Sequence, residues 1–117
     1  MIKVFLVEDE YVIREGIKKN IDWQAHGYEF CGEAGDGELA FPMIQEIRPD
    51  IVITDIRMPF MDGIELMHKI KEKYPYIKLV IISGYDDFQY AKEALIHGVL
   101  DYILKPINAR EMSEVLQ

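Results

Sequence analysis

Short runs of branched apolar residues alternate along the chain with segments in which apolar residues recur every three or four positions. A continuous apolar run is typical of a strand that is buried on both faces of a parallel sheet. The second spacing is typical of an amphipathic helix. The apolar runs predict five strands, at Ile2–Val7, Tyr28–Ala34, Asp50–Asp55, Ile77–Ile82 and Leu100–Leu104.

A helix is predicted after each strand, and most of these helices begin at a residue that can cap one. The predicted helices are Tyr11–Ile21, one from Asp36 to about Ile47, one from Asp62 to Tyr74, one from Asp86 to His97, and a short one after Asn108. Five β/α units in strict alternation predict a single α/β domain with a parallel sheet and helices on both faces.

Two features depart from this regular scheme. Pro42 falls inside the second helix, where a missing backbone hydrogen bond costs about 3 kcal/mol unless the helix kinks. The last helix reaches Gln117 without a glycine or proline stop. Residues 1–117 are therefore expected to be the N-terminal fragment of a longer protein.

Composition narrows the class of protein. A chain of 117 residues, of which 50% are hydrophobic and 29% charged, is typical of one soluble globular domain. The net charge of −8 disfavours direct binding to nucleic-acid phosphates, and no apolar run is long enough to span a bilayer. The lone Cys31 cannot form an internal disulfide, which agrees with a cytoplasmic location.

Polar residues with reactive side chains directly follow four of the predicted strands: Glu8 and Asp9, Asp55, Ser83, and Lys105. In an open parallel sheet, ligands bind in the crevice outside the carboxyl ends of the strands. These residues are therefore predicted to meet in one site. Taken singly, the acidic pair could be a solvated loop and Lys105 a surface charge.

The chemistry of this set indicates a metal and a phosphoryl group. Three clustered carboxylates would repel one another without a cation, and Mg²⁺ suits them because it takes few protein oxygens and commonly bridges to phosphate. The Ser83 hydroxyl and the Lys105 ammonium could bind a phosphoryl oxygen. Asp55 is the predicted nucleophile, because aspartate forms acyl-phosphates. No base is visible beside Ser83, which argues against a hydrolase triad.

These residues and their sequence context resemble the CheY-like receiver domains of two-component response regulators. The resemblance covers the whole chain and is carried by LVEDE, DIVITDIRMPFMDG, VIISGYDDFQYAKEAL and GVLDYILKPI. It implies a five-stranded parallel sheet in the order 2-1-3-4-5. It also implies roles for individual residues: Asp55 as phosphoacceptor; Glu8, Asp9, Asp55 and the backbone carbonyl of Arg57 as Mg²⁺ ligands; Ser83 and Tyr102 as switch residues; and Lys105 as the partner of the phosphate.

The family implies a signalling domain rather than an ordinary enzyme, although one that can catalyse its own phosphorylation and dephosphorylation. A sensor histidine kinase would supply the phosphoryl group, and the altered conformation would control an output domain. The motifs resemble receivers joined to an AraC-type helix-turn-helix domain, so DNA would be contacted only through that C-terminal domain. The apolar residues Phe88, Ala91 and Leu95 suggest a phosphorylation-dependent homodimer, or simply packing on the sheet.

Two other classes of function compete with this one. A Mg²⁺-dependent phosphohydrolase with an aspartyl-phosphate intermediate would need a second acid or base and a substrate cap, and neither is evident. A flavodoxin-like carrier of FMN would need a phosphate-binding loop after the first strand. That loop is Glu8-Asp9-Glu10 here, and it would repel a phosphate.

Overall fold

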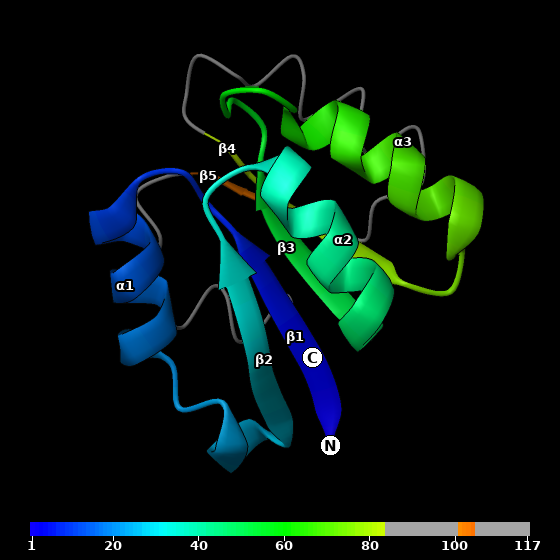
Figure 1. Cartoon of the computed structure of the whole chain (residues 1–117). Coiled ribbons are helices and arrows are strands. Elements are labelled where there is room, and N and C mark those ends of the chain that lie inside the picture. The colour runs from blue at the N-terminus through cyan, green and yellow to red at the C-terminus, as the bar shows by residue number, and fades with distance from the viewer. Residues whose placement is uncertain (84–100, 105–117) are drawn as a thin grey trace.

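The computed structural model describes residues 1–83 and 101–104. Its centre is a parallel sheet of five strands in the order β2-β1-β3-β4-β5 (Figure 1). The strands are β1 (Ile2–Val7), β2 (Tyr28–Ala34), β3 (Ile51–Asp55), β4 (Lys78–Ser83) and β5 (Asp101–Leu104). Sequence and structure agree on β1 and β2 to the residue, and the other three strands each begin one residue later than predicted.

Three α-helices lie within the described residues: α1 (Tyr11–Asn20), α2 (Gly37–Ile47) and α3 (Gly63–Lys73). A short 3₁₀ helix, Gln24–His26, was not predicted. None of the described helices is long and apolar enough to cross a membrane. The two helices predicted after Asp86 and Asn108 lie outside the described residues, as does the proposed dimer face of Phe88, Ala91 and Leu95.

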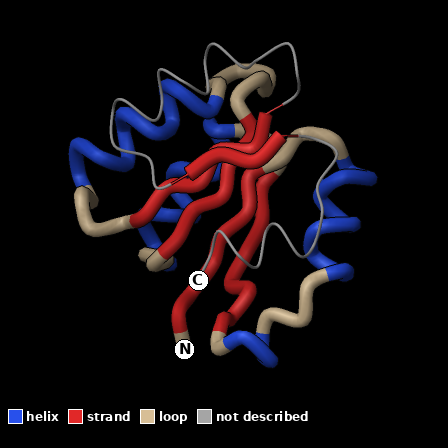
Figure 2. The backbone as a smooth tube through the Cα atoms, turned by 180° about the vertical axis from the view of Figure 1, so that it is seen from behind, coloured by secondary structure: helices blue, strands red, loops and turns tan. Residues whose placement is uncertain are grey.

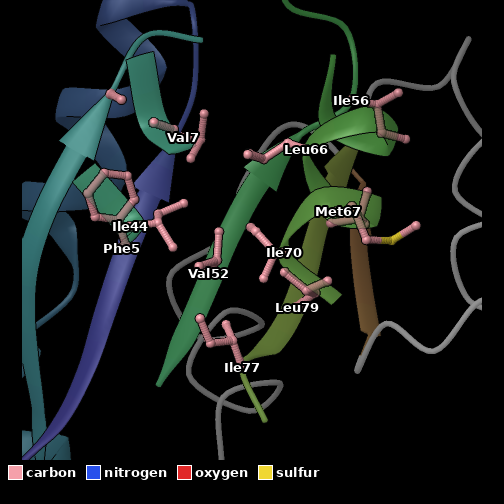
Figure 3. Close-up of a cluster of buried hydrophobic side chains, with 13 residues drawn as sticks. Phe5, Val7, Ile44, Val52, Ile56, Leu66, Met67, Ile70, Ile77 and Leu79 are labelled. Carbon is pink, nitrogen blue, oxygen red and sulfur yellow. The ribbon is translucent and has the colours of Figure 1, made fainter. Parts of the chain in front are cut away.

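Helices cover both faces of the sheet. α1 lies on one side, and α2 and α3 lie together on the other (Figures 1 and 2). Successive residues of β1 accordingly point into two different cores: Val4 and Leu6 pack with Ile17 of α1, whereas Phe5 and Val7 pack with α2 and α3. Figure 3 shows the core that contains Phe5 and Val7. Burial on both faces explains why the strands read as continuous apolar runs.

Aspartate side chains fix the starts of α2 and α3, as predicted. Oδ1 of Asp36 accepts a hydrogen bond from the Leu39 N–H at 2.8 Å, and Oδ1 of Asp62 accepts one from the Glu65 N–H, also at 2.8 Å. Each bond satisfies one of the N–H groups that a helix start leaves without a partner. Both helices therefore begin next to the carboxyl edge of the sheet.

Pro42 lies inside α2, which continues through it as a single helix. The backbone carbonyl that loses its donor is that of Glu38, four residues earlier. Both Glu38 and Pro42 are exposed, so water can bond to this carbonyl. On the opposite face, the buried Ala40 and Ile44 hold the helix against the sheet.

Candidate metal centre at the carboxyl edge of the sheet

The adjacent strands β1 and β3 bring three acidic residues together. Val7 lies opposite Thr54 in the parallel register of these strands, so Glu8 and Asp55 are the next residues at the same edge. Carboxylate oxygens of Glu8, Asp9 and Asp55 all lie within 4.8 Å of one another. The predicted acidic cluster is therefore present.

The cluster is buried on one side and open to solvent on the other. Glu8 is 0% exposed and Asp55 3%, whereas Asp9 is exposed. Three negative charges at this separation repel one another, and the repulsion is stronger where water is excluded. A hard divalent cation would offset it, and Mg²⁺ fits the donor set because it binds through one to a few carboxylate oxygens and keeps several waters. The exposed Asp9 side leaves room for those waters.

Backbone groups orient Asp55. Its Oδ1 accepts a hydrogen bond from the N–H of Ile56 at 2.8 Å. The buried Thr54 hydroxyl donates to the Asp55 carbonyl at 2.9 Å. One carboxylate oxygen is thus held in place by the chain itself. The hydrogen bond from Thr54 was not predicted, because a single threonine within an apolar run is typical of any buried strand.

The loop between β3 and α3 folds back against Asp55. The N–H of Gly63 donates to the carbonyl of Ile56 at 2.7 Å. A Cβ atom at position 63 would lie 2.0 Å from the Asp55 carbonyl oxygen, so only glycine allows this approach. The carbonyl of Met61 accepts a bond from Gly37 at 3.2 Å, which ties the same loop to the start of α2. The loop is therefore fastened at two points next to the acidic cluster.

Ser83 lies at this edge by its backbone position. Asp55 is opposite Ile82 in the register of β3 and β4, so Ser83 is one residue further along the neighbouring strand. Tyr102 lies within β5, opposite Ile81. The backbone agrees with the predicted placement of both residues, and their switch roles stay predictions.

The structure does not test the predicted roles of two further site residues. Arg57 is exposed in the loop two residues after Asp55, and ligation of the metal by its carbonyl stays a prediction. Lys105 lies outside the described residues.

Sequence reasoning missed Arg14, whose guanidinium lies beside the acidic loop. Its Nη1 donates to the Glu8 carbonyl at 2.7 Å, and its Nε donates to Glu33 at 3.2 Å. The sequence held one weak signal, a pair of basic residues at Arg14 and Lys18 on one side of the first helix.

Comparison with known proteins agrees with this geometry. The family model of the response regulator receiver domain matches residues 4–117. The transcriptional regulatory protein YesN of Bacillus subtilis is 39% identical over 117 residues, which is 100% of this chain and 32% of that protein. The transcriptional regulatory protein HptR of Staphylococcus aureus is 40% identical over 116 residues, which is 99% of this chain and 45% of that protein.

Solved structures agree in fold. The receiver domain of AraT from Geobacillus stearothermophilus superposes with a TM-score of 0.92 at 43% identity, covering 97% of this chain and 88% of that chain. A two-component transcriptional regulator AraC from Clostridium phytofermentans gives a TM-score of 0.91 at 35% identity, with coverages of 99% and 90%.

The chain belongs to the response regulator receiver family, the signalling domains of two-component systems. The predicted family is confirmed, and its α/β fold with a parallel sheet is the one observed. The chain spans 32% of the length of YesN and 45% of the length of HptR.

Proposed function

We propose that Asp55 accepts a phosphoryl group from a sensor histidine kinase in a Mg²⁺-dependent transfer. The observation that carries this proposal is the cluster of Glu8, Asp9 and Asp55, with carboxylate oxygens within 4.8 Å of one another. Two of the three residues are buried at the end of adjacent strands. Family membership favours a receiver over the two competing classes, a phosphohydrolase and an FMN carrier.

In the transfer, a carboxylate oxygen of Asp55 attacks phosphorus. The bond between phosphorus and the imidazole nitrogen of the donor breaks, and that nitrogen keeps the electron pair. The product is an acyl-phosphate on Asp55. Glu8, Asp9 and the Arg57 carbonyl would hold Mg²⁺ together with Asp55. When bound, Mg²⁺ supplies charge neutralisation for the phosphoryl oxygens.

The remaining polar residues would act on the product. Lys105 would pair with a phosphoryl oxygen, and the Ser83 hydroxyl would gain a hydrogen bond that is available only after transfer. Such a differential contact is what shifts a two-state equilibrium. Tyr102 would change position with Ser83, which would carry the signal away from the phosphorylation site towards an output domain.

The output domain would lie outside this chain. YesN and HptR are named as transcriptional regulatory proteins, and the chain spans less than half of either. We propose that residues 1–117 form the N-terminal receiver of a cytoplasmic transcriptional regulator. The net charge of −8 supports a DNA contact through that other domain, because this chain as a whole would repel nucleic-acid phosphates.

Incubation with acetyl phosphate followed by intact-mass measurement tests the transfer. One phosphoryl addition should appear with Mg²⁺ and be lost with EDTA or in Asp55→Asn. Asp22→Asn is a matched control, because it makes the same change of charge at an exposed position. Labelling of Asp55→Asn to the parent level, or labelling that ignores Mg²⁺, would show that the site is assigned wrongly.

A further inference from the structure

Arg14 connects the loop that carries the acidic pair to the end of β2. The residue lies in the first turn of α1, and its side chain is 17% exposed. Nη1 donates to the Glu8 carbonyl at 2.7 Å, and Nε donates to Oε1 of Glu33 at 3.2 Å. A planar guanidinium can hold two acceptors in fixed directions, which an ammonium group cannot do.

The peptide groups of Glu8 are therefore held on both sides. The Glu8 N–H donates to the carbonyl of Ala34 at 3.1 Å, while its carbonyl accepts from Arg14. Ala34 and Glu33 are the last two residues of β2. One anchor of the loop is thus the end of β2 itself, and the other is Arg14 of α1, which Glu33 ties to the same strand end. Together they fix where Glu8 and Asp9 leave β1.

A second cation holds Glu33 and provides a natural comparison with Arg14. Lys18 Nζ lies 3.0 Å from Oε2 of Glu33, and the Lys18 side chain is 43% exposed. The hydrogen bond to Glu33 raises the pKa of Lys18. Lys18 and Arg14 therefore share one carboxylate, whereas the bond to the Glu8 carbonyl belongs to Arg14.

We infer that Arg14 is a positioning residue of the metal centre, which holds the Glu8-Asp9 loop in the geometry that binds a divalent cation. The inference rests on the proposed Mg²⁺ site. Protein side chains that are already ordered lose less conformational entropy when they coordinate a metal ion. Holding the loop in place beforehand therefore raises the affinity for Mg²⁺. Loss of a partner that orients metal ligands typically weakens metal binding about 10–100-fold.

Calorimetric titration of Mg²⁺ into Arg14→Ala, Arg14→Lys and Lys18→Ala tests this role. Arg14→Ala should weaken binding about tenfold, and Arg14→Lys should restore part of the loss. Lys18→Ala should stay close to the parent, because it removes a cation from Glu33 and leaves the loop contact intact. In protein without Mg²⁺, hydrogen exchange at the amides of residues 8–10 should be faster in Arg14→Ala alone.

The fluorescence of Trp23, a buried residue and the only tryptophan, reports whether each variant is folded. If Arg14→Ala does not fold, Glu33→Gln takes its place, since it weakens the anchor of Arg14 and should reduce Mg²⁺ affinity more than Lys18→Ala does. Parent-like affinity and exchange in folded Arg14→Ala would overturn the inference, as would an equal loss in Lys18→Ala. Absence of Mg²⁺ binding by the parent would instead overturn the proposed function, and this inference with it.

Discussion

Replacing Asp55 by asparagine should stabilise the protein without Mg²⁺ and remove its stabilisation by Mg²⁺. Asparagine has nearly the same size, and its Oδ1 can still accept the 2.8 Å hydrogen bond from the Ile56 N–H. The substitution removes the negative charge at position 55, which is nearly buried and lies close to the carboxylates of Glu8 and Asp9. Two repulsive pairs are therefore removed.

The separation sets the magnitude. At 4.8 Å each pair repels by about 0.9 kcal/mol in water and by about 3.5 kcal/mol at an effective dielectric constant of about 20. Solvent screens the exposed Asp9, so the lower value applies to its pair. The hydrogen bond from the Ile56 N–H is stronger to a charged acceptor than to a neutral amide, which offsets part of the rest. We expect the substitution to raise the free energy of unfolding without metal by about 1–2 kcal/mol.

Urea unfolding followed by Trp23 fluorescence, in EDTA and in Mg²⁺, measures both effects. Mg²⁺ at 100 times its dissociation constant should stabilise the parent by about 2.7 kcal/mol and leave Asp55→Asn nearly unchanged. Asp22→Asn makes the same change in net charge away from the site. Its Oδ1 can keep the bond to the Ala25 N–H, so its unfolding should respond to Mg²⁺ as the parent does.

Lower stability of Asp55→Asn than of the parent in EDTA would show that burial and repulsion do not dominate the energy of this carboxylate. The ligand assignment fails if Mg²⁺ stabilises Asp55→Asn as much as it stabilises the parent. A gain in EDTA that Asp22→Asn reproduces would point to the overall charge of the protein rather than to the cluster.

Three substitutions test the account of the backbone given above. Gly63→Ala should destabilise the fold by about 3 kcal/mol or more, because the new Cβ would lie 2.0 Å from the Asp55 carbonyl oxygen. Gly16→Ala, whose Cβ would meet only Asn20 Nδ2, at 3.9 Å, among the residues that the structure describes, should stabilise α1 by about 0.5–1 kcal/mol. Equal effects of these two glycine substitutions in urea unfolding would contradict this account. Pro42→Ala should stabilise the protein by about 1–3 kcal/mol, as it restores a donor for Glu38, and an unchanged unfolding midpoint would show that α2 has no such defect.

The strands and the acidic cluster could be predicted because their signals are local. Each central strand is an apolar run buried on both faces, and Glu8 and Asp55 directly follow such runs. The capping aspartates Asp36 and Asp62 act on amides three residues away. A signal that lies within a few residues of the structure it specifies is visible in a single sequence.

The rest depends on contacts between distant parts of the chain. Arg14 and Glu33 are 19 residues apart and meet only when α1 packs beside the end of β2. The clash that requires glycine at position 63 appears only once the loop folds back on Asp55. Pro42 shows the converse. The sequence predicts that it weakens the helix locally, but the packing of Ala40 and Ile44 in the core keeps the helix intact.

Register decides whether the acidic residues meet at all. All five residues of β3 are buried, so hydrophobicity distinguishes poorly between neighbouring registers, although a slip of one residue would turn Asp55 to the opposite face. Asp50 supplies the missing information at the start of the strand. Its Oδ2 accepts a bond from the Lys3 N–H at 2.8 Å, its N–H donates to the Lys3 carbonyl at 2.9 Å, and its carbonyl accepts from the Lys78 N–H at 2.9 Å.

Asp50 thus joins β3 to β1 and to β4 at once, five residues before Asp55. At the other end of β3, Gly63 packs so closely against the Asp55 carbonyl that a Cβ atom there would lie 2.0 Å from its oxygen. Polar groups of Asp50 thus specify the register at the start of β3, while the apolar residues of the strand provide the stability. Asp55 therefore reaches Glu8 and Asp9 because of a residue at the opposite edge of the sheet, which takes no part in the chemistry.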